Sequence, residues 1–362
     1  MRTATTATRT EQAPALPSLL WDDVGVLVDR VLADWVSASR SAASTGSVRQ
    51  LWERVGTGLE GGKRVRPQLV FHAYSAFGGT DPQACATLGA AIELLHGALV
   101  VHDDVIDRDF VRRGRPNISG LYRDDAASHE LPPEEAGHRG ASVAVIAGDL
   151  LLAGAFRLCD RSSLDADVRE RLSEVMHTAV VDAAAGELED VLMAHDPGRT
   201  LEEVLEMERL KTAAYSFAAP LRLGTILAGA PAARAADVAR VGMLVGTAYQ
   251  VIDDVLGTFG DEHQTGKPVT SDLRERKLTV LTAYARTHPE VARHLAGGAE
   301  DGNTGVDRVR SVLREVGADT HALTLAHTLA TEALDEARRC DLPPALRSEL
   351  TRICNHVLHR EH

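Results

Sequence analysis

The sequence predicts an all-α protein, and three observations support this. Alanine and leucine dominate a chain that is 44% hydrophobic but only 4% aromatic, a composition that favours packed helices over sheets. The main apolar runs are long enough for helices and free of proline. No period-two alternation of β-branched residues persists anywhere in the chain. We expect one large helical bundle that forms a single domain over residues 17–362.

Charge and cysteine content limit the functions that this chain can serve. A formal net charge of −13 argues against a nucleic-acid partner and against an anionic membrane surface. The four cysteines have no metal-ligand spacing, so we expect reduced thiols in a cytoplasmic protein. Residues 1–16 lack a long apolar stretch and predict a disordered leader, and no run indicates a membrane span.

One or two amphipathic helices are expected over residues 17–55, with a Ser/Ala/Gly-rich joint near 37–47. The segment 61–70, GGKRVRPQLV, then indicates a helix start at Pro67. Three cations precede that proline: Lys63, Arg64 and Arg66. A helix N-terminus binds phosphate well, although such a loop taken alone is more often a solvated turn.

A long apolar helix is predicted to end in acids within residues 91–115, AIELLHGALVVHDDVIDRDFVRRGR. The acids share one region of the helix: Asp103, Asp104 and Asp107. His96 lies two turns earlier on the same face, and Arg112 and Arg113 follow the acids. Such close carboxylates repel one another unless a cation lies between them, and hard oxygen ligands suit Mg²⁺. Arginine matches phosphate oxygens, so this stretch indicates a metal and diphosphate site, whereas the acids alone would also fit a solvated helix end.

The middle of the chain is predicted to pack around this helix. Residues 120–140 are polar and contain two prolines, which indicates an exposed loop. A strongly apolar helix follows from residue 141, and another helix is expected over residues 166–195.

Two positions on the second of these helices, Glu187 and Asp190, share one face and could line a pocket. The next helical stretch, LEMERLKTAAYSFAAP, carries Lys211 and Thr212 followed by small residues, and we expect it to kink or end at Pro220. A lone lysine on a helix is more often a surface residue than a ligand, but the close-packed alanines around it favour a functional role.

A second apolar helix ends in acids within residues 247–277, TAYQVIDDVLGTFGDEHQTGKPVTSDLRERK. Four positions share one side of it: Gln250, Asp253, Asp254 and Gly257. The helix should stop near Gly257 or Gly260, and a loop containing Lys267 should follow. A further helix then begins at SDLRERK and is expected to contain Lys277.

The remaining residues, 278–362, alternate helical patterns with a Gly-rich loop at 297–305, and the amphipathic helix that ends the segment, LPPALRSELTRICNHVLHREH, is assigned to scaffolding. Two apolar helices that both end in acids followed by cations form a repeated arrangement. If they faced each other in a bundle, their carboxylates would hold several Mg²⁺ ions around one diphosphate.

These blocks together resemble the trans-isoprenyl diphosphate synthases, or polyprenyl synthetases, over roughly residues 55–280. The matching blocks are GGKRVRP, ELLHGALVVHDDVID with RRGRP, KTAAYSF, and YQVIDDVLGTFGDE with GKPVTSDLRERK. Their sequence pattern is most similar to that of actinobacterial geranylgeranyl diphosphate synthases. The resemblance implies a bundle of the isoprenoid synthase type with its active site in a central cavity, and a homodimer. It also implies head-to-tail condensation of isopentenyl diphosphate with allylic diphosphates, giving geranylgeranyl diphosphate by ionisation, condensation and elimination.

The resemblance also implies a role for each matching residue. Catalysis would use Lys211 and five aspartates, which would bind three Mg²⁺ ions and the allylic diphosphate: Asp103, Asp104, Asp107, Asp253 and Asp254. The same diphosphate would be bound by Arg112, Lys211 and Lys267, and the allylic substrate would also touch Thr212 and Gln250. Isopentenyl diphosphate would be bound by Lys63, Arg66, His96 and Arg113.

The same resemblance implies that two residues about one turn before Asp103 set the length of the product. Ala98 and Leu99 are not aromatic, and in this family a bulky aromatic side chain there stops growth at fifteen carbons. We therefore expect a product of twenty carbons or more. One departure from the family is Gly257, where members often carry a third aspartate; Asp261 lies nearby in the sequence.

Three other functions fit parts of the sequence. A class I terpene cyclase would share the fold and the first acidic motif, but would leave Lys63, Arg66, His96 and Arg113 without a second diphosphate to bind. A non-catalytic regulatory subunit of a heteromeric synthase would be expected to lose acids from the first motif, and this chain keeps all three. A phosphohydrolase of the HD type could use His96, His102 and Asp103, but would leave the second acidic cluster unexplained.

Overall fold

The computed structural model describes residues 19–160, 164–194, 196, 198–260, 271–296 and 303–359. The predicted leader, Lys267 and residues 297–302 of the predicted Gly-rich loop lie outside the described residues. The last three residues of that predicted loop begin a helix, α15.

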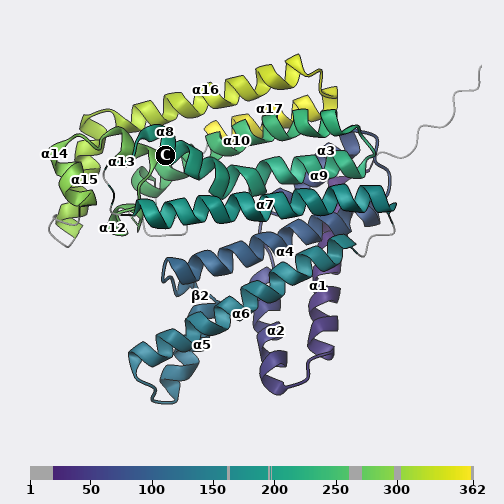
Figure 1. Cartoon of the computed structure of the whole chain (residues 1–362), viewed down its shortest axis with the longest axis horizontal. Coiled ribbons are helices and arrows are strands. Elements are labelled where there is room, and N and C mark those ends of the chain that lie inside the picture. Colours follow the sequence, from purple (N-terminus) through teal and green to yellow (C-terminus); the bar gives the residue numbers. More distant parts are fainter. Residues whose placement is uncertain are drawn as a thin grey trace, which may run out of the picture.

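Long helices stacked side by side form the body of the molecule, and a helical hairpin of α1 and α2 extends from it (Figure 1). The N-terminal half contains α1 (Trp21–Ser41), α2 (Gly46–Leu59), α3 (Val65–Ala76), α4 (Pro82–Ile106), β1 (Val111–Arg112), β2 (Arg115–Pro116), α5 (Ile118–Ser128) and α6 (Pro133–Asp160). The central part contains α7 (Ala166–Met193), α8 (Leu201–Glu208), η1 (Arg209–Ala218), α9 (Ala219–Leu227) and α10 (Ala232–Phe259). The C-terminal part contains α12 (Ser271–Arg274), α13 (Val280–Tyr284), α14 (Pro289–Leu295), α15 (Asn303–Glu315), α16 (Ala318–Arg339) and α17 (Pro344–Leu358). The all-α prediction is therefore confirmed; over the described ranges, β1 and β2 are the only strands.

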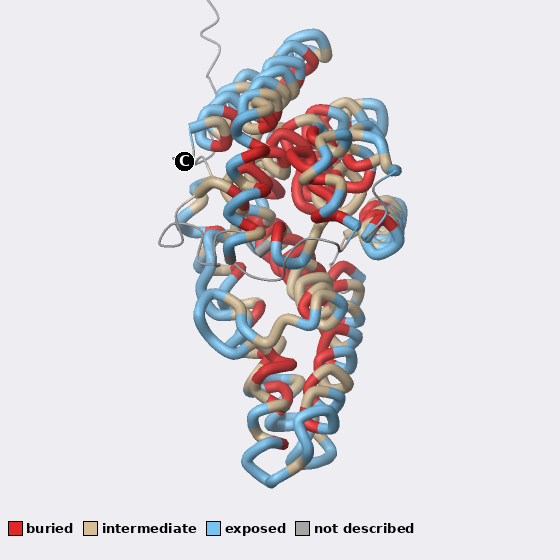
Figure 2. The backbone as a smooth tube through the Cα atoms, turned by 90° about the vertical axis from the view of Figure 1, so that its left-hand side faces the viewer, coloured by how far each residue is buried: buried red, intermediate tan, exposed pale blue. Residues whose placement is uncertain are grey.

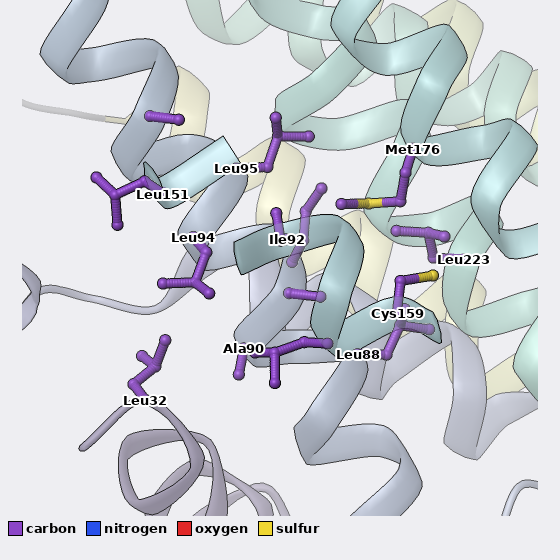
Figure 3. Packing of buried hydrophobic residues seen from close by; sticks show 14 of the residues in the cluster. Leu32, Leu88, Ala90, Ile92, Leu94, Leu95, Leu151, Cys159, Met176 and Leu223 are labelled. Atoms are coloured by element: carbon purple, nitrogen blue, oxygen red, sulfur yellow. The ribbon is translucent and has the colours of Figure 1, made fainter. Parts of the chain in front are cut away.

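Helix α4 is the central element of the larger hydrophobic core. Asp81 caps its N-terminus by accepting from the backbone N–H groups of Gln83 and Ala84, and Pro82 stands in its first turn. Ile92, Leu94 and Leu95 are fully buried, with side chains of α6, α7 and α9 around them (Figure 3). Figure 2 shows buried backbone running through the middle of the bundle and exposed backbone outside it. Each such side chain contributes roughly 1.5–3 kcal/mol by leaving water, so the end of α4 is held in a rigid frame.

The helix predicted to end or kink at Pro220 instead continues through it. Residues 201–227 are helical throughout, and the middle segment, η1, is a π-helix. The last wide hydrogen bond runs from the N–H of Ala219 to the carbonyl of Ala214, so the missing N–H of Pro220 falls where the π register returns to α. The π-helix is a rare form that is frequently found at functional sites.

Glycines on two neighbouring helices explain how η1 packs so closely. A Cβ atom on Gly186 of α7 would lie 2.2 Å from the backbone nitrogen of Lys211, and one on Gly246 of α10 would lie 2.7 Å from Cα of Ala213. Neither position has room for a side chain, so both helices approach the backbone of η1 directly.

The prediction of an exposed loop over residues 120–140 was wrong. Most of the segment belongs to α5 and to the start of α6, and the side chain of Asn117 caps α5 by accepting from the N–H of Gly120. The two helices touch through glycine: a Cβ on Gly140 would lie 2.3 Å from the carbonyl oxygen of Ser119. Because the contact depends on glycine and backbone, the polar composition of the segment conceals it.

Two helices are more apolar than the sequence analysis allowed. By length and composition alone, α4 and α6 could each cross a membrane, against the prediction that no run indicates a span. In the bundle, 61% of the apolar window of α4 and 44% of that of α6 are buried inside the protein. Core packing accounts for the apolar surface of α4.

None of the four cysteines forms a disulfide: Cys85, Cys159 and Cys354 are buried, and Cys340 is half-buried. Burial raises the pKa of Cys85 to about 12 and those of Cys159 and Cys354 to about 11. These three thiols are therefore unreactive core side chains.

The contact between α3 and α9 should be sensitive to a single methyl group. A Cβ on Gly224 would lie 2.2 Å from the carbonyl oxygen of Val70, and that backbone cannot move without separating the helices. We expect Gly224→Ala to lower the free energy of unfolding by about 1–3 kcal/mol in urea titrations. Gly58→Ala is the matched control, because a Cβ on Gly58 meets nothing within 4 Å and removing a helical glycine is stabilising. Equal stability of the two variants would contradict this packing.

Candidate active site

The first acidic motif lies at the C-terminal end of α4, beside the β-hairpin that carries Arg112. The hairpin pairs Arg112 with Arg115 through a two-residue turn, and both turn residues, Arg113 and Gly114, have positive φ, as hairpin turns of this length require. Arg112 donates from Nε to Oδ1 of Asp104 at 2.7 Å and from Nη2 to Oδ2 of Asp103 at 3.2 Å. The hairpin therefore fixes a guanidinium between the first two acids.

These two acids have different surroundings. Asp104 is almost fully buried, and this burial raises its pKa although Arg112 acts against it. Burial would also raise the pKa of Asp103, but Lys211, Lys277 and Arg112 outweigh it and lower that pKa. Asp103 is therefore the carboxylate held charged by surrounding cations.

Lys211 links the π-helix to the first motif. Its Nζ lies 2.6 Å from Oδ2 of Asp190, 2.8 Å from Oε2 of Glu187 and 3.3 Å from Oδ1 of Asp103. Burial alone would lower the pKa of Lys211, but these three carboxylates raise it. Helix α7 thus brings both Glu187 and Asp190 to the ammonium group, and whether they line a pocket stays a prediction. Thr212 follows Lys211 in η1 and is half-buried.

Lys277 reaches the third acid of the first motif. Its Nζ lies 2.5 Å from Oδ2 of Asp107 and 3.2 Å from Oε2 of Glu275. The sequence analysis placed Lys277 inside a helix, which was wrong: it stands between α12 and α13, where the chain is not helical. Being outside a helix allows its side chain to span from the second acidic region to the first.

The second acidic motif ends α10 as predicted, and Asp254 is its best-defined side chain. Oδ1 of Asp254 accepts from Nε2 of Gln250 at 3.0 Å, and Oδ2 accepts from the N–H of Val280 at 3.2 Å. Burial raises the pKa of Asp254 to about 7, and buried Glu208 beside it also has a raised pKa. Asp254 thus fastens α10 to α13, a placement that does not support its predicted role as a metal ligand. Asp253, its neighbour, is half-buried.

A separate cationic region surrounds His96 on the other side of the motif. His96 stacks on Tyr215 with ring centroids 6.0 Å apart, and Arg66 lies over the same ring at 5.0 Å and donates to Oγ of Ser216 at 2.7 Å. Burial lowers the pKa of His96 well below its usual value, and four guanidinium groups lower it further: Arg66, Arg112, Arg113 and Arg64. The structure therefore collects the predicted residues Arg66, His96 and Arg113 at one place.

The remaining residues of this region have mixed roles. Lys63 is exposed, and its own loop comes close to Arg113, whose Nη1 would lie 3.8 Å from a Cβ atom on Gly62. Arg64 is structural, because it donates to Asp29, to Glu93 and to the carbonyl oxygen of Leu59. Tyr215 and Ser216, which hold Arg66, were missed by the sequence analysis; only their position in KTAAYSF, one helical turn after Lys211, could have indicated them.

The arrangement of histidines opposes a phosphohydrolase of the HD type. His102 turns toward α6, with Nε2 3.5 Å from Oδ1 of Asp149, whereas His96 faces Tyr215. The two rings thus belong to different surroundings and cannot share a metal with Asp103.

The chemistry of the acids fits magnesium, since the predicted ligands are carboxylates, the hard oxygen donors that this ion prefers. Across the described ranges, no three His, Cys, Asp or Glu side chains converge closely enough to hold a metal ion. The acids instead form ion pairs with cations. Asp103 pairs with Lys211 and Arg112, and Asp107 pairs with Lys277. Cavity size does not indicate this site either: a cavity of about 1050 Å³, lined by α7, α8, η1, α10 and α16, includes none of the predicted site residues.

Comparison with known proteins places the chain in a family. Residues 51–316 match the family model of the polyprenyl synthetases. A geranylfarnesyl diphosphate synthase of Aeropyrum pernix is 31% identical over 92% of this chain and 98% of its own length. A geranylgeranyl diphosphate synthase of Mycobacterium tuberculosis is 32% identical over 87% of this chain and 80% of its own length.

A solved structure agrees with these relatives. The geranylgeranyl pyrophosphate synthase of Corynebacterium glutamicum, complexed with isoprenyl diphosphate and magnesium, superposes with a TM-score of 0.87 at 26% identity, covering 95% of this chain and 100% of that one. The fold and the site define a helical synthase with two acidic motifs. The chain belongs to the polyprenyl synthetase family.

Lowering the pH should reduce the stability of the fold, because protonating buried His96 among arginines costs free energy. Because its pKa is lowered in the folded protein, the unfolded chain takes up the proton first as the pH falls below about 6.5, and stability decreases. We expect wild type to lose about 1 kcal/mol more stability than His96→Gln between pH 7.5 and 5.5, measured by urea unfolding. His138→Gln removes an exposed histidine of α6 and serves as control. An identical pH dependence of wild type and His96→Gln would show that His96 is not buried among cations.

Proposed function

We propose that this chain catalyses the magnesium-dependent, head-to-tail condensation of isopentenyl diphosphate with allylic diphosphates and releases geranylgeranyl diphosphate. One observation carries the proposal: α4 has a carboxylate cluster bridged by Lys211, Lys277 and Arg112 at its end, and a separate arginine cluster around His96. Two substrates that each bear a diphosphate need two such anion sites close together.

The allylic diphosphate is assigned to the end of α4. Three Mg²⁺ ions would be held by the acids of the two motifs, chiefly Asp103 and Asp107 of the first motif and Asp253 of the second. Magnesium, when bound, would neutralise the diphosphate and so favour its departure. Lys211 and Arg112 already lie beside Asp103, and they would donate to the leaving diphosphate as negative charge develops on it. Lys267, Thr212 and Gln250 keep their proposed contacts with the allylic substrate.

Isopentenyl diphosphate is assigned to the cationic region of Lys63, Arg66, His96 and Arg113. The lowered pKa of His96 keeps its imidazole neutral at pH 7, so it would donate one N–H without adding charge. Arg66 and Arg113 would supply the charge. A terpene cyclase uses no second diphosphate, and this concentration of cations would then be unexplained.

Geranylgeranyl diphosphate is proposed as the product because the positions before the first motif are small or aliphatic. Ala98 is fully buried, and Leu99 is half-buried and packs against the core around α4. Neither blocks the space below Asp103 with an aromatic ring. Among the relatives, the product names differ in chain length, so the tunnel residues of this chain carry that part of the proposal.

The proposal also places the enzyme in the cytoplasm as a homodimer. The buried free thiols suit a reducing compartment. Val145 and Ile146 of α6 are exposed by 42% and 53%, and a second copy could cover them.

Product analysis tests the reaction. Purified protein with Mg²⁺, labelled isopentenyl diphosphate and each allylic diphosphate in turn should give a twenty-carbon diphosphate. We expect Asp103→Asn to lower kcat by about 10²–10³ because it removes a group at the point where charge develops. Asp149→Asn, an exposed acid of α6, is the matched control. A hydrocarbon formed from the allylic diphosphate alone would indicate a cyclase, and no turnover of any primer would indicate a regulatory subunit.

Product length should respond to the residue one turn before Asp103. In Leu99→Phe a ring would close the tunnel, and we expect the main product to shorten from twenty to fifteen carbons with little loss of total turnover. Leu99→Met keeps the volume and should leave the product unchanged. Chromatography of the dephosphorylated alcohols measures both, and an unchanged product from Leu99→Phe would locate the tunnel floor on another helix.

A further inference from the structure

Arg64 adopts a backbone conformation that arginine does not favour. Its φ of +48° and ψ of +39° lie in the left-handed region, where a side chain crowds its own backbone and glycine is the usual residue. Gly61 and Gly62, earlier in the same loop, also have positive φ. The loop therefore uses glycine at two left-handed positions but arginine at the third. Strain of this kind persists where the surrounding structure over-determines the residue.

The side chain of Arg64 joins the helices that surround this loop. Its Nε donates to Oδ1 of Asp29 on α1 at 2.9 Å, and its Nη2 donates at 2.7 Å to the carbonyl oxygen of Leu59, the last residue of α2. Its Nη1 lies 3.0 Å from Oε1 of Glu93 on α4. Its own carbonyl oxygen accepts from the N–H of Gln68 at 3.0 Å, which begins α3. One residue thus fixes the start of α3 relative to three other helices.

The contact with α4 is the enclosed part of this arrangement. The side chains of Arg64 and Glu93 are each only 11% exposed, so loss of one would leave the charge of the other without compensation. Glu93 shares a face of α4 with Gly89 and His96, which lie four residues before it and three residues after it. A Cβ atom on Gly89 would lie 3.2 Å from Cβ of Pro67. This face therefore receives the start of α3 at two points, one turn from His96.

The loop held in this way carries two cations of the proposed isopentenyl diphosphate region. Lys63 precedes Arg64, and its carbonyl oxygen accepts from Nε2 of Gln68 at 2.8 Å. Arg66 stands in the first turn of α3 and donates to Ser216. All three guanidinium nitrogens of Arg64 already donate to protein groups. Arg64 can therefore act on a bound diphosphate through its neighbours, whose placement before binding raises affinity.

We propose that Arg64 and Glu93 are positioning residues for isopentenyl diphosphate. Their ion pair holds residues 61–66 in the strained form that places Lys63 and Arg66 for the diphosphate, and neither of the two contacts the substrate. This inference rests on the proposed function, because it deepens the assignment of that substrate to this cationic region.

The Michaelis constants of the two substrates test the proposal. Arg64→Gly relieves the left-handed strain but removes the guanidinium, and we expect it to raise the KM for isopentenyl diphosphate about 10-fold, with kcat and the allylic KM within about twofold of wild type. Glu93→Ala should do the same. The double variant should be no worse than either, because both changes release the same loop. Arg64→Lys keeps the charge without the fork and should give an intermediate KM even if the glycine variant unfolds.

Arg40→Gly is the matched control. It removes the same side chain from an exposed ion pair between α1 and α2 and places glycine in a helix, so it should lower stability without changing either KM. A parallel rise of both KM values in Arg64→Gly, or an unchanged KM for isopentenyl diphosphate, would overturn the proposal and leave Arg64 with a structural role alone.

Metal-free binding separates this inference from the proposed function. With a chelator present, the acids at the end of α4 repel anions, so calorimetry with inorganic diphosphate reports on the cationic region. Arg64→Gly should bind about 10-fold more weakly than wild type, and equal binding would overturn the role of Arg64. Wild type that binds inorganic diphosphate but condenses no substrates refutes the proposed reaction and not the positioning. Wild type that binds no diphosphate would overturn both.

Discussion

The repulsion among the carboxylates at the end of α4 is the constraint on which the rest of the structure depends. Three acids stand within one and a half turns, at the end of a helix that is largely buried. Like charges in such a setting must be neutralised, and here the neutralising groups come from three other elements: Arg112 from the neighbouring hairpin, and Lys211 of η1 and Lys277 after α12 from distant parts of the chain. Electrostatics thus draws three elements to one point.

Packing determines how closely these elements can approach. The hydrophobic core around Ile92 and Leu95 holds α4 still, and the glycines of α7 and α10 let η1 lie against both helices at backbone contact. The wide π register then turns Lys211 toward Asp103 and Tyr215 toward His96 from a single segment. Helix α4, which carries Asp103 and His96, and η1, which carries Lys211 and Tyr215, therefore fix the position of the acids relative to the arginine region.

Much of this could be predicted from the sequence, because apolar periodicity and acid spacing are local properties. The two acid-tipped helices, the cation-rich loop before α3 and the importance of Lys211 followed from the order of residues alone. The α5–α6 contact did not, because it is made by glycine and backbone and carries no apolar pattern. The burial of Asp254 and the reach of Lys277 also could not be predicted, since both depend on where α13 packs, a contact distant in the sequence.

The π-helix has a consequence for how such an enzyme can be altered. Its neighbours Gly186 and Gly246 touch backbone and carry no side chain, so neither position can acquire a new group without moving Lys211 or Ala213. Libraries that vary the site should keep both glycines fixed and place their diversity on α4, at the positions that we propose set the product length. Under the proposed function, the glycines that place Lys211 are therefore separate from the side chains of α4 that would set the size of the product.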